Sequence, residues 1–247
     1  MSDNATARDS DGRLLRPARQ GTPVLLDPRL TVWLSPAFPV GAFAYSHGLE
    51  WAAEKVWVRD RATLSDWLRD LLEHGAPHND LILLAASARA MVCRDWSDIA
   101  STNELALALQ PAAERHLETV AQGNAFLQAI NAAWVFPDSA RATQVLAPDA
   151  AYPVVVGVVC AAHGIATPAA LSAFALAFVS NQVSAAIRLS IIGQTDGQRV
   201  IAELMPVIAV TAARAAQSTL DDLGGCALRA DVAALAHETQ YTRLFRS

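Results

Sequence analysis

Lysine is almost absent from this chain, since Lys55 is the only one among 247 residues and arginine carries the rest of the basic charge. A phosphate-binding loop of the nucleotide-hydrolase type needs Gly-Lys-Ser/Thr, because the lysine reaches the terminal phosphates and the hydroxyl reaches magnesium. Here the lysine lies between Glu54 and Val56. No G-x-G-x-x-G segment follows a strand-like run either. The sequence therefore excludes both common nucleotide-binding motifs.

Cysteine is also scarce, and Cys93, Cys160 and Cys226 lie far apart in no paired spacing. This pattern is typical of a reducing compartment without a disulfide framework. Residues 1–29 are polar and contain no apolar stretch resembling a signal peptide. We therefore expect a cytoplasmic protein with a disordered N-terminal tail over residues 1–29. A net charge of −5 argues against a generic affinity for nucleic acid.

Charged residues are missing altogether from residues 150–187. A membrane-spanning helix needs roughly 20 continuous apolar residues. This stretch is interrupted by His163-Gly164 and by Thr167-Pro168. We expect buried core helices here and no membrane partner, although a small membrane-associated helical protein remains an alternative.

Helical periodicity dominates the chain after residue 40. An apolar stripe at i, i+3, i+4, i+7 and i+8 is formed by Leu64, Trp67, Leu68, Leu71 and Leu72. Only VVVGVV at 154–159 has strand character, and its surroundings favour a helix beginning near Pro153. We predict an all-α fold, with a single helical domain of about eight to ten helices over residues 30–247.

Capping residues and prolines predict where individual helices begin. The expected starts are Asn79, Ser97 or Asp98, Pro111, Thr167-Pro168, Thr195 in a capping box with Gln198, and Ala230. Pro206 falls inside the helix that starts near Thr195. Gly75 is placed to end the helix that contains the apolar stripe.

Candidate catalytic and metal-binding residues are few. His237-Glu238 begins the zinc-protease pattern H-E-x-x-H, but Tyr241 stands where the second histidine would be. His74 and His78 are expected on a turn, where solvation is commoner than metal binding. We assign no metal ligand, no cofactor site and no enzymatic activity to the chain alone.

His47 and Glu50 have the spacing to face the same way on one helix. They could support proton transfer in a metal-dependent helical enzyme, which is the alternative function. No nucleophile or oxyanion hole accompanies them apart from Ser46. We favour a polar cluster that caps or cross-links helices.

The C-terminal stretch HETQYTRLFRS at 237–247 combines aromatic and arginine residues. Such residues are the usual anchors of protein interfaces. Large apolar side chains such as Leu244 and Phe245 are unfavourable in a freely solvated tail. We therefore predict a docking segment, with His237, Tyr241, Arg243, Phe245 and Arg246 in contact with a partner.

Five collinear blocks together resemble the UreF family of urease accessory proteins. They are SPAFPVGAFAYSHGLEWA (35–52), ERHLETVAQGNAFL (114–127), YPVVVGVVCAAHGI (152–165), SNQVSAAIRL with GQTDGQRV (180–200) and HETQYTRLFRS (237–247). The resemblance extends from about residue 30 to the C-terminus. It implies an all-α cytoplasmic homodimer that is not itself an enzyme.

By this resemblance the chain would join UreD (also called UreH) and the GTPase UreG on apo-urease. It would take part in inserting the nickel metallocentre of urease, either by stimulating GTP hydrolysis in UreG or by gating it. Nickel and GTP would belong to the assembled complex, and the C-terminal block would contact UreD.

The residues carried over as partner-binding candidates come from three of the blocks. They are Tyr45, Ser46, His47 and Glu50 in the first block, Gln194, Thr195 and Asp196 in the later polar turn, and Arg243 and Arg246 in the terminal block. Ala236 departs from the family, which usually has arginine there. In the first block, Pro36, Pro39 and Gly41 predict a rigid corner that presents Phe43, Tyr45 and His47.

Overall fold

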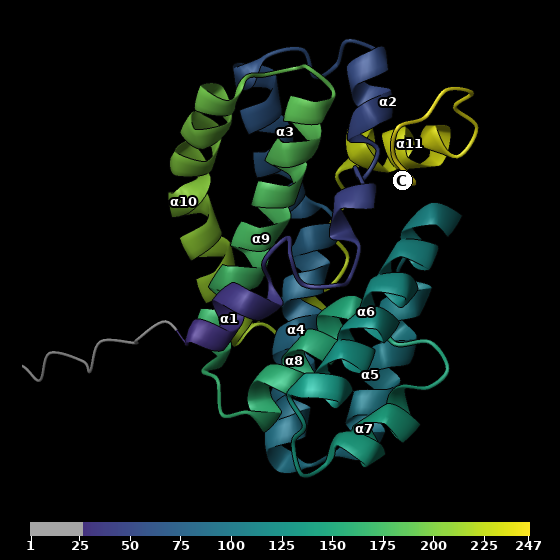
Figure 1. The fold of residues 1–247 in the computed structure, drawn as a ribbon, viewed down its shortest axis with the longest axis vertical. Coiled ribbons are helices and arrows are strands. Elements are labelled where there is room, and N and C mark those ends of the chain that lie inside the picture. The colour runs from purple at the N-terminus through teal and green to yellow at the C-terminus, as the bar shows by residue number, and fades with distance from the viewer. Residues whose placement is uncertain (1–26) are drawn as a thin grey trace, which may run out of the picture.

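The structure, a computed structural model, describes residues 27–247, so residues 1–26 of the expected tail lie outside the described part. Within the described part the chain forms eleven α-helices, two short 3-10 helices and no strand, which confirms the all-α prediction (Figure 1). The elements are α1 (Pro28–Trp33), η1 (Ala42–Ala44), α2 (Leu49–Glu54), α3 (Arg61–His74), α4 (Ala76–Cys93), α5 (Trp96–Ala108), α6 (Ala113–Ala133), α7 (Ser139–Leu146), α8 (Tyr152–Ala162), α9 (Thr167–Arg188), α10 (Gln194–Gln217), η2 (Leu220–Asp222) and α11 (Leu228–His237). Asp27 caps α1 by accepting a hydrogen bond from the Arg29 N–H at 2.9 Å, so helical structure begins before residue 30.

The central helix of the molecule is α4, which packs against α3, α5, α8, α9 and α10 (Figure 1). Its residues 81–86 are all buried, because the sequence is apolar on nearly every side. The closest neighbour, α8, crosses α4 at Gly157. A Cβ on that glycine would lie only 2.2 Å from Ser87 Oγ, so the close approach of the two helices requires glycine.

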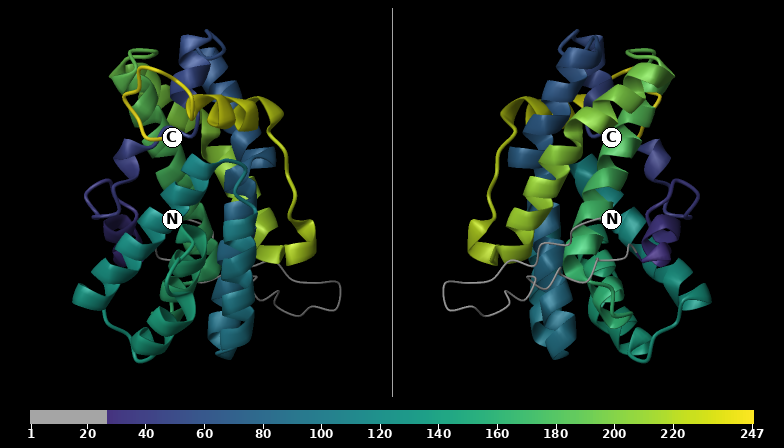
Figure 2. Two further views of the ribbon diagram at one scale, coloured as in Figure 1. Left: turned by 90° about the vertical axis from the view of Figure 1, so that its right-hand side faces the viewer. Right: turned by 90° about the vertical axis from the view of Figure 1, so that its left-hand side faces the viewer.

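The two longest helices, α9 and α10, pack side by side along one side of the molecule (Figures 1 and 2). Both are long and apolar enough to cross a membrane, yet 50% and 39% of their most apolar windows are buried inside the protein. The preceding helix α8 is buried from Pro153 to Cys160. The charge-free stretch thus forms one helix that is buried over most of its length, α8, and one partly exposed helix, α9.

Two predicted capping residues lie inside helices, whereas one predicted start is confirmed. Asn79 lies inside α4, where its Oδ1 accepts a hydrogen bond from the Gly224 N–H at 3.1 Å. Thr195 lies inside α10, whose first residue is Gln194, and no side chain caps that helix. The start predicted at Thr167-Pro168 is confirmed, since α9 begins at Thr167 with Pro168 in its first turn, although no side chain caps this helix.

The starts of α5 and α6 also differ from the prediction. Asp95, rather than Ser97 or Asp98, caps α5 and accepts the Asp98 N–H at 2.9 Å. Pro111 precedes α6, which begins at Ala113 after a non-helical Ala112. Both helices begin within about two residues of the predicted positions, which is the usual precision of a helix boundary.

The turn over residues 35–48 brings the first sequence block to the interior. Gly41 has φ 72° and leads into η1, while Gly48 has φ 75° and precedes α2. A Cβ on Gly48 would lie 2.7 Å from the backbone nitrogen of Ala234 in α11, so glycine permits α2 and α11 to pack closely.

The predicted corner exposes Phe43, but Tyr45 is buried and only 12% of the His47 side chain is exposed. The prediction that all three are presented is therefore wrong for Tyr45 and His47.

Candidate functional site

The structure brings the first and last sequence blocks together at the end of the molecule occupied by α2 and α11 (Figures 1 and 2). We call residues 238–247, which follow α11, the C-terminal segment. Its backbone lies against residues 44–46: the Arg246 N–H donates to the Ala44 carbonyl at 2.8 Å and the Ser46 N–H donates to the Ser247 carbonyl at 2.7 Å. The Ser46 hydroxyl donates to the same Ser247 carbonyl.

Glu50, near the start of α2, holds the C-terminal segment through its backbone. Its carboxylate accepts hydrogen bonds from the Leu244 N–H at 2.6 Å and the Phe245 N–H at 2.9 Å. The Glu50 side chain is largely buried, and so is Phe245. Because these two amides belong to a segment with no regular structure, the carboxylate supplies acceptors that a helix would otherwise provide.

His237, the last residue of α11, lies fully buried between two carboxylates. Its Nδ1 is 2.7 Å from Glu114 and its Nε2 is 3.3 Å from Glu50. The ring can donate to both carboxylates only in its protonated form. Arg243 also pairs with Glu114, so the C-terminal segment is joined to α6 as well as to α2.

A second buried cluster lies beside the first and is centred on Glu118 of α6. This carboxylate pairs with Arg115, lies 2.9 Å from His47 Nε2, and accepts the Ser247 hydroxyl at 2.8 Å. Burial alone would raise the pKa of Glu118, but the charge of Arg115, the neighbouring His47 and the hydrogen bonds hold it at about 2.

The backbone of His47, a member of this cluster, lies in the left-handed region, with a φ of 53°. Its Nε2 lies 3.0 Å from an Arg115 nitrogen as well as 2.9 Å from Glu118. Burial, and then the charge of Arg115, lower the pKa of His47. Through Nε2 an uncharged ring either accepts a hydrogen bond from Arg115 or donates one to Glu118, so this one atom does not serve both partners at once.

His47 and Glu50 do not form a joint catalytic pair. His47 contacts Glu118, whereas Glu50 contacts His237 and the backbone of the C-terminal segment. Among residues 27–247, no group of three or more His, Cys, Asp or Glu side chains could hold a metal ion. The hypothesis that these residues cap and cross-link structure describes the observed contacts better than the enzyme alternative.

The predicted partner-binding residues divide into anchors and exposed side chains. Tyr45, Ser46, Glu50, His237 and Phe245 are buried. In contrast, the exposed residues of the C-terminal segment include Tyr241, Arg243, Leu244 and Arg246, among which Tyr241 is completely exposed.

The third predicted group lies apart from the first two, at the start of α10. Asp196 pairs with Arg199 of the same helix at 2.9 Å, and Gln194 and Thr195 are exposed. In the described part of the chain, no hydrogen bond joins Gln194, Thr195 or Asp196 to the C-terminal segment or to residues 45–50. These residues therefore form a separate exposed patch.

Sequence reasoning missed four charged residues of the site. Glu114, Arg115 and Glu118 hold the two clusters together, and the Arg188 guanidinium lies 4.4 Å from the centre of the Phe245 ring. The first three lie in the quoted block 114–127, where two acids and a base at helical spacing could have indicated a buried polar face. Arg188 carries no such signal, because only folding places it over Phe245.

Comparison with known proteins identifies the family of this chain. A family model described as UreF matches residues 58–205. The urease accessory protein UreF of Methylorubrum populi is 51% identical over 219 residues, which cover 89% of this chain and 98% of the relative. The protein of the same name from Rhodopseudomonas palustris (strain HaA2) is 53% identical, with 89% and 92% covered. This chain belongs to the UreF family.

The UreF family consists of urease accessory proteins, which are non-catalytic factors in the maturation of urease. The resemblance inferred from the five blocks is therefore confirmed. The matched residues 58–205 include Arg115 and Glu118 but neither the first block nor the C-terminal segment. The residues matched by the family model thus include the α6 part of the site. The other contacts of the site are made by residues 44–50 and by the C-terminal segment, which lie outside the match.

Proposed function

We propose that this chain is a non-enzymatic scaffold in the cytoplasm that helps to assemble the nickel metallocentre of urease. It acts as a homodimer and bridges UreD (UreH) and the GTPase UreG on apo-urease. Nickel is the cargo and GTP is the ligand of UreG, so neither is a resident cofactor of this chain. We further propose that residues 30–247 act as one unit, without contact to nucleic acid or insertion into a membrane.

The observation that carries this proposal is the anchored C-terminal segment. Buried Phe245, together with the Glu50 carboxylate, fixes the backbone so that Tyr241 and Leu244 point to solvent, 102% and 63% exposed. Exposed aromatic and aliphatic side chains on a held backbone lose little entropy on binding, which favours a protein contact. We propose that this face binds UreD.

The patch at Gln194, Thr195 and Asp196 serves a second contact in this proposal. It is exposed at the start of α10 and separate from the C-terminal segment. A bridging protein requires two such surfaces, so we assign this patch to UreG or to apo-urease. Whether the chain stimulates or gates GTP hydrolysis is decided by measuring that rate with and without the chain.

The proposal is tested by size-exclusion chromatography with light scattering on the chain alone, with purified UreD, and with UreD and GTP-loaded UreG. The variant Leu244→Asp places a charge in the proposed UreD contact and should weaken the complex with UreD at least about tenfold. The dimer itself should be retained. The matched control is Val92→Asp on α4, where an equally apolar side chain is 74% exposed outside the proposed surfaces.

Two results would contradict the scaffold proposal. One is a monomer that binds neither UreD nor UreG. The other is a complex that Leu244→Asp and Val92→Asp weaken equally, since the C-terminal segment would then have no special part in docking.

A further inference from the structure

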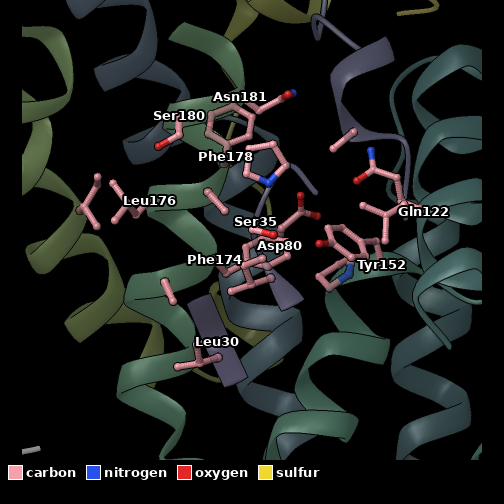
Figure 3. Close-up of a pocket in the computed structure, with 18 of the residues that line it drawn as sticks. Leu30, Ser35, Asp80, Gln122, Tyr152, Phe174, Leu176, Phe178, Ser180 and Asn181 are labelled. Carbon is pink, nitrogen blue, oxygen red and sulfur yellow. The ribbon is translucent and has the colours of Figure 1, made fainter. Parts of the chain in front are cut away.

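A cavity of about 550 Å³ opens between α9, α6 and the turn that follows α1 (Figure 3). Its walls are mostly apolar and include Leu30, Leu34, Phe174, Leu176 and Phe178. This volume lies in the range of pockets that hold small molecules. The cavity is bordered by the Glu118 cluster, since His47, Arg115 and Glu118 also line it.

Asp80 of α4 reaches into this apolar cavity. In Figure 3 its carboxylate lies near the centre of the view, between the Phe174 and Phe178 rings on one side and Tyr152 and Gln122 on the other. Within residues 27–247 the Asp80 carboxylate forms no hydrogen bond and no ion pair. Burial raises the pKa of Asp80 to about 7, with a further increase from Glu118 and an opposing effect from Arg115. An unpaired carboxylate in such surroundings is costly unless a cation or a proton neutralises it.

The other titratable groups that line the cavity do not neutralise Asp80. Arg115 is already paired with Glu118, and burial lowers the pKa of His47 so that its ring is uncharged. Burial raises the pKa of Tyr152, which keeps its hydroxyl protonated. When Asp80 is ionised, these groups together carry a single negative charge.

We propose that this cavity binds a small organic cation, an amine with an apolar or aromatic body, whose ammonium group pairs with Asp80. The rings of Phe174, Phe178 and Tyr152 offer faces to the cation and its apolar body. A neutral ligand would leave the carboxylate unpaired, and an anion would be repelled by it. A bare metal ion would find no set of three protein ligands in the described part of the chain.

The test is isothermal titration calorimetry of the isolated chain with benzylammonium, at roughly pH 8 so that Asp80 is ionised. A ligand of this size should bind with a dissociation constant of about 0.1 to 1 mM. Benzyl alcohol, which has nearly the same shape but no charge, should bind at least about tenfold more weakly. Equal binding of the two, or no binding of benzylammonium at about 10 mM, would overturn the proposal.

Two variants and a control locate the binding. Asp80→Asn removes the charge and Ala177→Phe fills the cavity from α9, and each should weaken benzylammonium binding at least about tenfold. The control Asp66→Asn changes an exposed carboxylate of α3 and should leave binding unchanged. Binding that survives both cavity variants would overturn the proposal.

Thermal unfolding shows whether a loss of binding reflects the site or the fold. Because burial disfavours the ionised form of Asp80, Asp80→Asn should unfold at the same or a higher temperature than the unchanged chain at roughly pH 8. A lower unfolding temperature would mean that Asp80 has a stabilising partner, and would count against the proposal. These measurements need no urease protein, so their failure leaves the scaffold proposal intact.

Discussion

Glu50 shows how much of the candidate site depends on one residue. Its carboxylate accepts two backbone N–H groups of the C-terminal segment and faces His237 Nε2 at 3.3 Å. All three contacts are formed by a group that is 8% exposed. Hydrogen bonds to a buried charge are stronger than neutral ones, and a buried donor without an acceptor is costly. The exposed positions of Tyr241 and Leu244 therefore depend on the Glu50 anchor.

Replacing Glu50 by glutamine should lower the free energy of unfolding by about 2 kcal/mol, because the amide cannot accept both backbone N–H groups and pair with His237. Urea denaturation followed by circular dichroism measures this change. The C-terminal segment should also become sensitive to limited proteolysis. The matched control is Glu104→Gln on α5, where the side chain is exposed. If both variants unfold at the same urea concentration, Glu50 is not an anchor.

At the scale of elements, the contact at Gly157 sets how closely the core helices α4 and α8 pack. At Gly157 a Cβ would meet Ser87 Oγ at 2.2 Å and the Leu84 carbonyl oxygen at 2.4 Å. The second atom belongs to the backbone of a buried helix, so a rotamer change cannot relieve the clash. The two helices would have to move apart, which would disturb α4 and the cavity that Asp80 faces.

Gly157→Ala should therefore destabilise the protein by about 2 kcal/mol or more, although alanine is the better helix former. Gly193→Ala is the control, since a Cβ there meets nothing within 4 Å. It should cost less than about 1 kcal/mol, the range for a change at a helix N-cap. Thermal and urea unfolding of both variants measure these changes. If Gly157→Ala leaves the free energy of unfolding unchanged, the α4–α8 contact has room for a methyl group.

At the scale of the whole molecule, the Glu118 cluster joins distant parts of the chain. Arg115 and Gln122 come from α6, His47 from the turn before α2, and Ser247 from the last position of the sequence. The folded protein holds the pKa of Glu118 at about 2, below its usual 4.5. The stabilisation is thus present above the usual pKa and is lost as the pH falls toward the lowered one.

We expect the free energy of unfolding to decrease as the pH falls from about 4.5 to about 2, in part through Glu118. Glu118→Gln should be less stable than the unchanged chain at neutral pH, and the difference should shrink across that interval. Urea denaturation at several pH values measures both curves. A difference that stays constant with pH would show that the charge of Glu118 does not contribute.

Much of the fold was predictable because helical periodicity and apolar content are properties of the sequence. The apolar stripe at Leu64–Leu72 lies buried in α3, and the nearly all-apolar stretch around Leu81–Met91 forms the central helix. The capping residues were predicted less well, since Asn79 and Thr195 carry the signature of caps but lie inside helices, whereas the start of α9 at Thr167 was predicted correctly. The five blocks indicated the family correctly, because their residue patterns and their order along the chain are also properties of the sequence.

The sequence by itself determined the helical class, the family and some of the residues that carry the polar chemistry, among them His47, Glu50 and His237. Only the tertiary structure decided how those residues are used. It separated His47 from Glu50, paired them with Glu118 and His237, and placed Asp80 in an apolar cavity. The physical reason is that periodicity and composition act over a few turns of helix, whereas a buried charge finds its partner among residues more than a hundred positions away, as Glu50 does with His237.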